Sequence, residues 1–290
     1  MRMQVVVVLV LVALAVVSVP AQEPAKQMTF ADKRDRDPMV SPDGKHLAFA
    51  SNRAGNFDIY LLSFGEAGVR QLTQSEKDDR FPAWSRDGKN LLFTSKRTGK
   101  GDIYEMPVDG GSGYLQLTSH PGMDSHPSYT RSGNGLLFTT SPKRTLKIRT
   151  QSTVVIAEDK MRANNVRVLA DGDDACFSPD GNSVVFVSNR TKNNDIWLMS
   201  ADGGLQTQLT TDEKDDENPR FSPNGKRIVF ASKRTGNFDI WVMNVDGSDK
   251  RQLTTSEADE TQPCWSSGDY IYFTRDVGDF GSNIFRIPAP

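Results

Sequence analysis

The chain has little cysteine, little histidine and almost no net charge. Two cysteines, Cys176 and Cys264, are too few for a disulfide framework, and three histidines leave little material for an all-histidine metal site. Lysine plus arginine total 35 against 37 acidic residues, a net charge of −2, which excludes a general nucleic-acid binder. With 37% hydrophobic and 25% charged residues, the composition is that of an ordinary folded protein.

Long apolar runs are also missing, apart from one at the N-terminus. Arg2 precedes an apolar run from Val5 to Val19, which is shorter than the roughly 20 residues of a membrane-spanning helix. Val19 and Ala21 are small residues at the −3 and −1 positions of a cleavage site, so residues 1–21 are predicted to be a secretory signal peptide. An uncleaved anchor is the alternative. Residues 22–290 are then a single domain, periplasmic or secreted, with no stable membrane span after cleavage.

An internal repeat organises the rest of the chain. Ser-Pro-Asp-Gly at Ser41, or a variant of it, recurs at intervals of 44, 45, 48, 44 and 44 residues, beginning at Ser85, Thr130, Ser178, Ser222 and Ser266. A strand-like run ending in phenylalanine follows each copy, then a polar loop, a second apolar run and a short Gln-Leu-Thr segment. No helix is predicted after the leader. Four short strands per repeat of about 45 residues are typical of a propeller blade, and the predicted fold is an all-β, six-bladed β-propeller with four antiparallel strands per blade.

The two ends of the chain are complementary. The last repeat lacks its Gln-Leu-Thr segment, while Lys26-Gln-Met-Thr29 precedes the first repeat with the spacing of Arg251-Gln-Leu-Thr254 before the sixth. Residues 26–30 are therefore predicted to complete blade six, so that the ring closes and no strand edge is left open.

The repeat resembles that of TolB-type propellers, a WD40-like family whose namesake is the periplasmic component of the Tol-Pal system. The resemblance covers about residues 26–290 and rests on Ser-Pro-Asp-Gly-Lys, Ser-Asn-Arg-x-Gly-Asn-Phe-Asp-Ile-Tyr and Gln-Leu-Thr. It implies a scaffold that docks a partner protein over its channel mouth, the namesake's partner being the peptidoglycan-associated lipoprotein. The namesake carries an α/β domain ahead of its propeller, whereas only residues 22–26 stand there in this chain.

Acidic residues recur three positions before the first strand's proline or its equivalent. They are Asp35, Asp79, Asp124, Asp216 and Glu260, with Asp173 beside Gly172 in the fourth repeat. Such a ring around a channel mouth is expected to favour Ca²⁺ or a basic peptide. The alternative is that each carboxylate serves its own turn or bridges adjacent blades.

Two further sets of charged residues are repeated or clustered on the same predicted face. Arg53 and Asp58, five apart, recur in three other repeats and suggest a cross-turn ion pair or an Asp turn cap. The third repeat instead has a longer basic loop, whose Lys143, Arg144, Lys147 and Arg149 are candidate partner contacts or a solvated loop.

The sequence contains no Gly-x-Ser-x-Gly elbow, His-Glu-x-x-His pair or Gly-rich phosphate loop. His120 and His126, with Asp124 between them, suggest either a metal or base role or hydrogen-bonded histidines, and the cysteines are expected to be buried free thiols. We predict a monomeric, exported scaffold that binds an envelope protein and has no cofactor, apart from Ca²⁺ in the channel as an option. The alternative functions are a propeller hydrolase or lyase and a glycan-binding protein, each using channel carboxylates.

Overall fold

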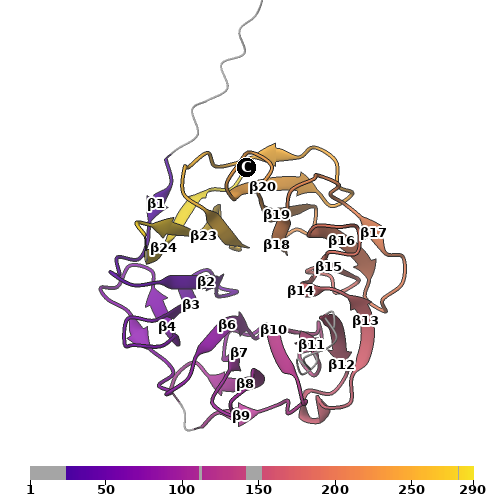
Figure 1. Ribbon diagram of the computed structural model, residues 1–290. Helices are drawn as coiled ribbons and strands as arrows, with labels where there is room; N and C mark the ends of the chain where they lie inside the picture. Colours follow the sequence, from indigo (N-terminus) through magenta and orange to yellow (C-terminus); the bar gives the residue numbers. More distant parts are fainter. Residues whose placement is uncertain (1–23, 111–112, 142–151, 280) are drawn as a thin grey trace, which may run out of the picture.

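The computed structural model describes residues 24–110, 113–141, 152–279 and 281–290. Six four-stranded antiparallel sheets stand around a central channel, as the sequence predicts (Figure 1). The innermost strand of each blade is the first in its repeat, and the outermost is a short strand of two to five residues.

The strand limits repeat closely from blade to blade. Blade one contains β2 (Asp35–Val40), β3 (His46–Ser51), β4 (Asp58–Ser63) and β5 (Arg70–Gln71). Blade two contains β6 (Asp79–Trp84), β7 (Asn90–Ser95), β8 (Asp102–Pro107) and β9 (Leu115–Gln116). Blade three contains β10 (Met123–Tyr129), β11 (Leu136–Ser141), β12 (Thr153–Ala157) and β13 (Arg167–Asp171).

The other three blades follow the same order. Blade four contains β14 (Asp173–Phe177), β15 (Ser183–Ser188), β16 (Asp195–Ser200) and β17 (Thr207–Gln208). Blade five contains β18 (Asp216–Phe221), β19 (Arg227–Ser232), β20 (Asp239–Asn244) and β21 (Arg251–Gln252). Blade six contains β22 (Glu260–Trp265), β23 (Tyr270–Val277), β24 (Gly281–Pro288) and β1 (Lys26–Gln27).

The N-terminal strand closes the ring, as predicted. β1 pairs antiparallel with β24, with Lys26 opposite Arg286 (Figure 1). The Thr29 hydroxyl accepts a hydrogen bond from the Ile284 N–H at 3.0 Å, as Thr73 does from Ile59 in blade one. The Thr of the repeat therefore keeps its role although it comes from the opposite end of the chain.

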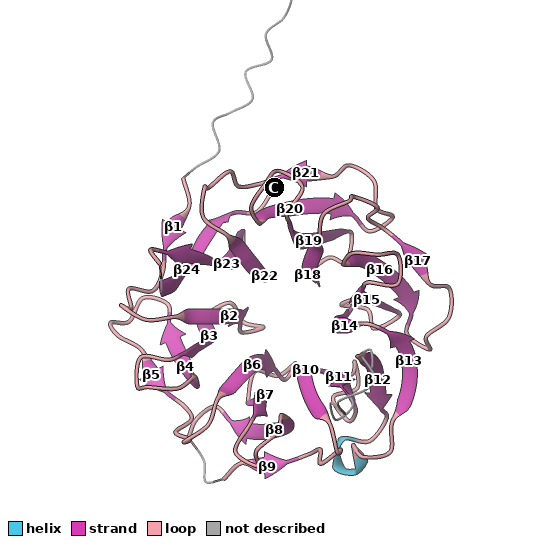
Figure 2. Cartoon of the chain, viewed as in Figure 1, coloured by secondary structure: helices cyan, strands magenta, loops and turns pink. Residues whose placement is uncertain are grey.

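One short helical turn was not predicted. It is the 3-10 turn η1 (Lys160–Arg162), coloured cyan in Figure 2, between β12 and β13. The Asp159 side chain accepts a hydrogen bond from the Met161 N–H and caps the turn. Among the described residues, no helix is long and apolar enough to cross a membrane.

The Ser-Pro-Asp-Gly segments form the tight turns between the first two strands. In blade one, Gly44 N–H donates to the Ser41 carbonyl at 2.9 Å, and the Ser41 hydroxyl donates to Asp43 at 2.6 Å. Gly44 has φ of +72°, a left-handed conformation that glycine adopts without steric cost. These turns lie at one end of the channel, which we call the turn face.

The core lies between neighbouring blades. The repeated phenylalanine is completely buried in every blade: Phe49, Phe93, Phe138, Phe186, Phe230 and Phe273. Burying one such side chain stabilises the fold by about 1.5–3 kcal/mol. Because each phenylalanine packs against the adjoining blades, the ring must close for all six to be shielded.

Candidate functional site

The five carboxylates of the acidic ring, Asp35, Asp79, Asp124, Asp216 and Glu260, are completely buried. They stand at the start of the innermost strands, on the face opposite the turns, which we call the acid face. Each has a cationic or imidazole partner from its own blade. Arg53 reaches Asp35 at 3.0 Å, Arg97 reaches Asp79 at 3.0 Å and Arg234 reaches Asp216 at 2.9 Å.

Each of these arginines also covers an aromatic ring of the third strand. The guanidinium carbon lies 4.8 Å from the Tyr60 ring in blade one and 4.6 Å from the Trp241 ring in blade five. In blade six, Arg275 contacts Glu260 at 2.5 Å and lies 4.3 Å from the Phe285 ring. A guanidinium between a carboxylate and an aromatic face gains both ionic and cation–π attraction. The aromatic ring therefore helps to hold each arginine in position against its carboxylate.

Burial also affects the protonation of these acids. It raises the pKa of Asp79 and of Glu260, although Ser95 and Arg97 act against it for Asp79, and Thr254 and Arg275 for Glu260. The five carboxylates are buried and paired within their own blades, so they do not present a ring of free negative charge at the channel mouth. Binding of Ca²⁺ or a basic peptide by these residues loses its structural support, as does a lyase or hydrolase using them.

The ring of acids is interrupted at blade four. A side chain at Gly172 would come within 2.4 Å of the Val187 carbonyl, so only glycine fits there. Asp173 does not replace the missing acid. It points to blade three, where its carboxylate lies 3.1 Å from His126 Nδ1.

The third blade uses histidine in place of arginine among its described residues. His120 Nδ1 lies 2.7 Å from the Asp124 carboxylate, and this hydrogen bond raises the pKa of His120. Both histidines are thus paired with carboxylates. No cluster of three or more His, Cys, Asp or Glu side chains suited to a metal ion occurs in the described part of the chain.

The predicted ion pair between Arg53 and Asp58 is wrong, because Arg53 pairs with Asp35, and Asp58 caps a later segment of the blade rather than its own turn. Asp58 accepts hydrogen bonds from the Thr73 hydroxyl at 3.2 Å and from the Ser75 N–H at 3.1 Å. It therefore holds the segment that follows the outer strand, whereas Arg53 pairs with Asp35 at the channel. Lys143, Arg144, Lys147 and Arg149 lie outside the described residues.

A cavity of about 400 Å³ occupies the channel on the turn face, opposite the acidic ring. Its lining begins at the second to fourth residue of each innermost strand and extends to the exposed turn residues Pro42, Pro179 and Pro223. Apolar side chains dominate the wall, among them Met39, Trp84, Phe177, Phe221 and Trp265. A concave apolar site with a few polar groups is the usual form of a binding site.

The inner end of this cavity is a ring of six residues, one per blade, that we call the waist. All six are non-glycine residues with φ between 47° and 55°: Asp37, Phe81, His126, Asp174, Asn218 and Gln262. Each lies at the register shift between the first and second strands of its blade, a β-bulge that turns the side chain toward the channel. Asp, Asn and His tolerate this conformation, but a bulky residue such as Phe81 rarely adopts it.

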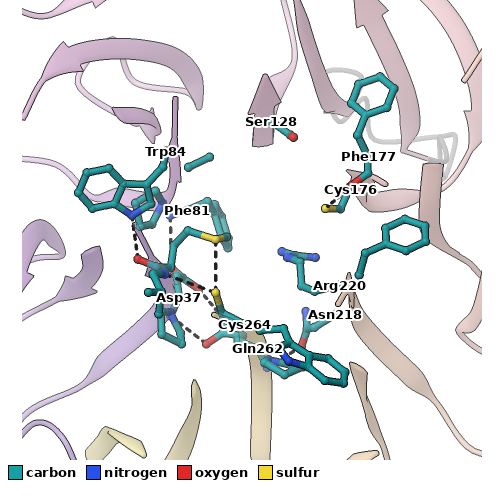
Figure 3. Close-up of a pocket in the computed structure, with 18 of the residues that line it drawn as sticks. Asp37, Phe81, Trp84, Ser128, Cys176, Phe177, Asn218, Arg220, Gln262 and Cys264 are labelled. Carbon is teal, nitrogen blue, oxygen red and sulfur yellow. Dashed lines mark hydrogen bonds between the residues drawn. The ribbon is translucent and has the colours of Figure 1, made fainter. Parts of the chain in front are cut away.

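Contacts join the waist residues around the ring. The Asn218 side-chain NH₂ group donates to the Asp174 carboxylate at 2.9 Å, and the Asn218 side-chain oxygen Oδ1 accepts from the backbone N–H of Gln262 at 3.1 Å. The Gln262 side chain accepts from the Asp37 N–H at 3.1 Å (Figure 3). The Phe81 and His126 rings lie 3.9 Å apart. Left-handed backbone at such residues costs about 1–3 kcal/mol each, so the contacts must hold it in place.

Two arginines flank the waist. Arg80 donates to both Asp37 oxygens, at 2.9 and 3.0 Å. Arg220 lies 2.7 Å from Asp174 and points into the cavity (Figure 3). Both cysteines are free thiols that line the cavity, but the expectation that both are buried is wrong for Cys176. Burial raises the pKa of Cys264 to about 11, while Cys176 is partly exposed in the wall.

The sequence analysis missed the cavity and the waist. The waist positions hold six residues of five types, so no shared residue type marks them as a set. The one available signal was that four of them are Asp, Asn or His, the types most often found with positive φ.

Comparisons with known proteins agree with the fold. A family model described as the TolB beta propeller domain matches residues 16–176 and 174–287. The chain is similar to the structure of putative TolB from Agrobacterium tumefaciens, with 27% identity, a TM-score of 0.62, and coverage of 73% of this chain and 76% of that one. A search of curated proteins finds no significant match.

More distant structures share the architecture. TolB from Acinetobacter baumannii has 19% identity and a TM-score of 0.68, covering 91% of this chain and 65% of that one. An oligogalacturonate lyase from Vibrio parahaemolyticus has 13% identity and a TM-score of 0.63, covering 91% and 93%. At these identities the likeness extends to the fold alone. The match of the family model over most of the chain is decisive, and the chain belongs to the TolB beta-propeller domain family.

Proposed function

We propose that this chain is an exported protein-interaction scaffold of the cell envelope, and that a partner protein docks over the channel on the turn face. Residues 1–21 would be removed on export, and residues 22–290 would form the scaffold. The observation that carries the proposal is the cavity of about 400 Å³, which is open toward the turns and lined mainly by apolar side chains.

Chemistry in the channel receives less support. The five carboxylates of the acidic ring are buried and paired, and His126 stands beside Asp173 rather than beside a nucleophile. A docking role requires only a shaped surface on a rigid ring, which the closed propeller supplies. The partner class is an envelope protein, of which a peptidoglycan-associated lipoprotein is the family's example.

Cys176 allows the proposal to be tested with a single chemical change. A bulky maleimide on this partly exposed thiol would fill the cavity, while Cys264, 3% exposed, would react far more slowly. We expect the unlabelled protein to retain a defined envelope protein in an affinity capture and the labelled protein to lose it. A Cys176→Ala variant treated with the same reagent is the control and should retain the partner. Equal capture by labelled and unlabelled protein would place the docking site elsewhere.

A further inference from the structure

The wall of the cavity just above the waist contains one side chain from each blade. Two residues beyond each waist position stand Met39, Ala83, Ser128, Cys176, Arg220 and Cys264. Five of these are uncharged and short or flexible. Arg220 is the exception, and its guanidinium projects between the blades into the open space (Figure 3).

Arg220 has hydrogen-bonding capacity that the protein does not use. A guanidinium has five N–H donors. One reaches the Pro219 carbonyl at 2.7 Å and another lies at ion-pair distance from Asp174, also 2.7 Å. No third partner of this guanidinium occurs within residues 24–110, 113–141, 152–279 and 281–290, so three donors remain for water or a ligand.

The charges around the cavity are balanced. Asp37 pairs with Arg80, Asp174 with Arg220 and Asp173 with His126. Burial opposes charge on His126, but the nearby carboxylates of Asp173 and Asp174 outweigh it and raise the pKa of the imidazole. A ligand carrying a carboxylate or an amine would therefore add an unbalanced charge to a mostly apolar space, which is costly.

A neutral hydrogen-bond acceptor avoids that cost. When a partner displaces the water from the cavity, the free donors of Arg220 would be left unsatisfied unless the partner supplies an acceptor. A backbone carbonyl is such an acceptor, and any loop that reaches the cavity brings one. The apolar wall around Met39, Trp84 and Phe177 in turn suits an uncharged side chain.

We infer that the docking partner inserts a loop into the cavity, placing an apolar side chain against its wall and a backbone carbonyl on the guanidinium of Arg220. This inference rests on the proposed function and specifies the chemistry of the partner. It assigns Arg220 two roles, as the partner of Asp174 in the fold and as the anchor for the loop.

A library of disulfide-cyclised heptapeptides displayed on phage provides a probe that does not require the natural partner. Selection on the purified protein is expected to enrich peptides with a central Leu, Phe, Met or Trp and no charged residue beside it. Enrichment of a conserved Asp or Glu would overturn the inference in favour of a carboxylate ligand. A conserved Lys or Arg, or no enrichment at all, would also overturn it.

Three variants then separate the chemistry from the docking face. Arg220→Lys keeps a cation for Asp174 but removes most of the free donors, and we expect peptide affinity to fall about tenfold. Ser128→Phe fills the cavity wall from blade three, two blades away from Arg220, and should abolish binding. Arg36→Lys, on the innermost strand of blade one beyond the waist, pairs with Asp276 and should leave affinity unchanged.

Comparing the loss of peptide binding in the variants shows whether the role of Arg220 or the docking face itself is refuted. Binding that Ser128→Phe abolishes but Arg220→Lys leaves intact would support the docking face and refute the role of Arg220. Binding that persists in Ser128→Phe would refute the docking face itself. Thermal unfolding of each variant shows whether it is folded, and Ser128→Phe keeps the test open if Arg220→Lys does not fold.

Discussion

At the scale of single residues, the repeated arginine is the main stabilising device of the acid face. In blade five it contacts the Asp216 carboxylate, the Ser232 hydroxyl at 2.7 Å and the Trp241 ring. The carboxylate is completely buried, whereas 15% of the Arg234 side chain is exposed. Because one partner is partly exposed, this pair has a lower desolvation cost than a fully buried ion pair, in which desolvation can exceed the Coulombic attraction.

Asp216→Asn should therefore destabilise the protein by about 3 kcal/mol, because it leaves the guanidinium of Arg234 without its counter-charge. The midpoint of urea unfolding measures the effect. The double variant with Arg234→Met should cost less than the sum of the two single changes. Asp171→Asn, which alters an exposed acid of the same face, is the matched control and should change stability by less than about 0.5 kcal/mol. Equal effects at the two positions would show that the buried pair contributes nothing.

His120 predicts a defined pH dependence. Its pKa in the unfolded chain is about 6.5, and the hydrogen bond to Asp124 raises it in the folded protein. Between these two values the folded protein binds more protons than the unfolded chain, so stability is full below about pH 6.5 and declines as pH rises through the folded pKa. Unfolding free energies at pH 6 and pH 9 should differ less in His120→Asn than in the unaltered protein. A slope that is the same in both would contradict this assignment.

At the scale of elements, the N-terminal strand is the closing part of the ring. β1 contributes two ladder residues, and Thr29 adds a hydrogen bond to the Ile284 N–H and lies 3.4 Å from the Asn283 side-chain oxygen. Asn283 takes the place held by Asp58 in blade one, so the shared blade keeps the anchoring of the repeat in modified form.

Removal of residues 24–30 should lower the thermal unfolding midpoint and expose the edge of β24 (Gly281–Pro288) to pairing with another chain. Size-exclusion chromatography should then show dimers or larger species. Thr29→Val tests the hydroxyl alone and should cost about 1 kcal/mol. Phe30→Ser is the control, since Phe30 is 80% exposed and its loss should be nearly neutral. A truncated protein that stays monomeric and equally stable would show that closure does not depend on this strand.

The sequence predicts the blades but not the cavity, and the roles of particular residues explain this difference. Phe49 recurs in all six repeats, and Ser41 and Gly44 each recur in five, because each has one local task, so their period reveals the strands and turns. The spacing of Arg53 and Asp58 suggests a local pair, whereas the partner of Arg53 is Asp35, 18 residues earlier across the first hairpin. The same interval separates Asp79 from Arg97 and Asp216 from Arg234, so the pairing is visible in the sequence once that longer spacing is considered.

The side of the channel that carries the cavity could not be inferred in this way. Alternation along a strand predicts which residues share a face, but the bulge at residues such as Asp37 and Phe81 interrupts the alternation. Its position depends on contacts between blades, such as those of Gln262 with Asn218 and Asp37. These contacts join residues 44 and 225 positions apart in the chain.

At the scale of the whole molecule, the ring separates two functions between its faces. The acid face is occupied by carboxylates paired with an arginine or a histidine within every blade except blade four, and these pairs stabilise the starts of the innermost strands. The turn face has a cavity with an apolar wall, free donors on Arg220 and a floor formed by the waist. We therefore expect the partner protein to dock on the turn face alone.

Photo-cross-linking from defined cysteines tests this placement most directly. A benzophenone maleimide would be attached to Cys176 in the Cys264→Ser variant, or to Asp171→Cys on the acid face with both native cysteines replaced. After irradiation in an envelope extract, the account predicts a discrete cross-linked envelope protein from Cys176 and none from position 171. A cross-linked product from position 171 alone, or none from either position, would contradict it.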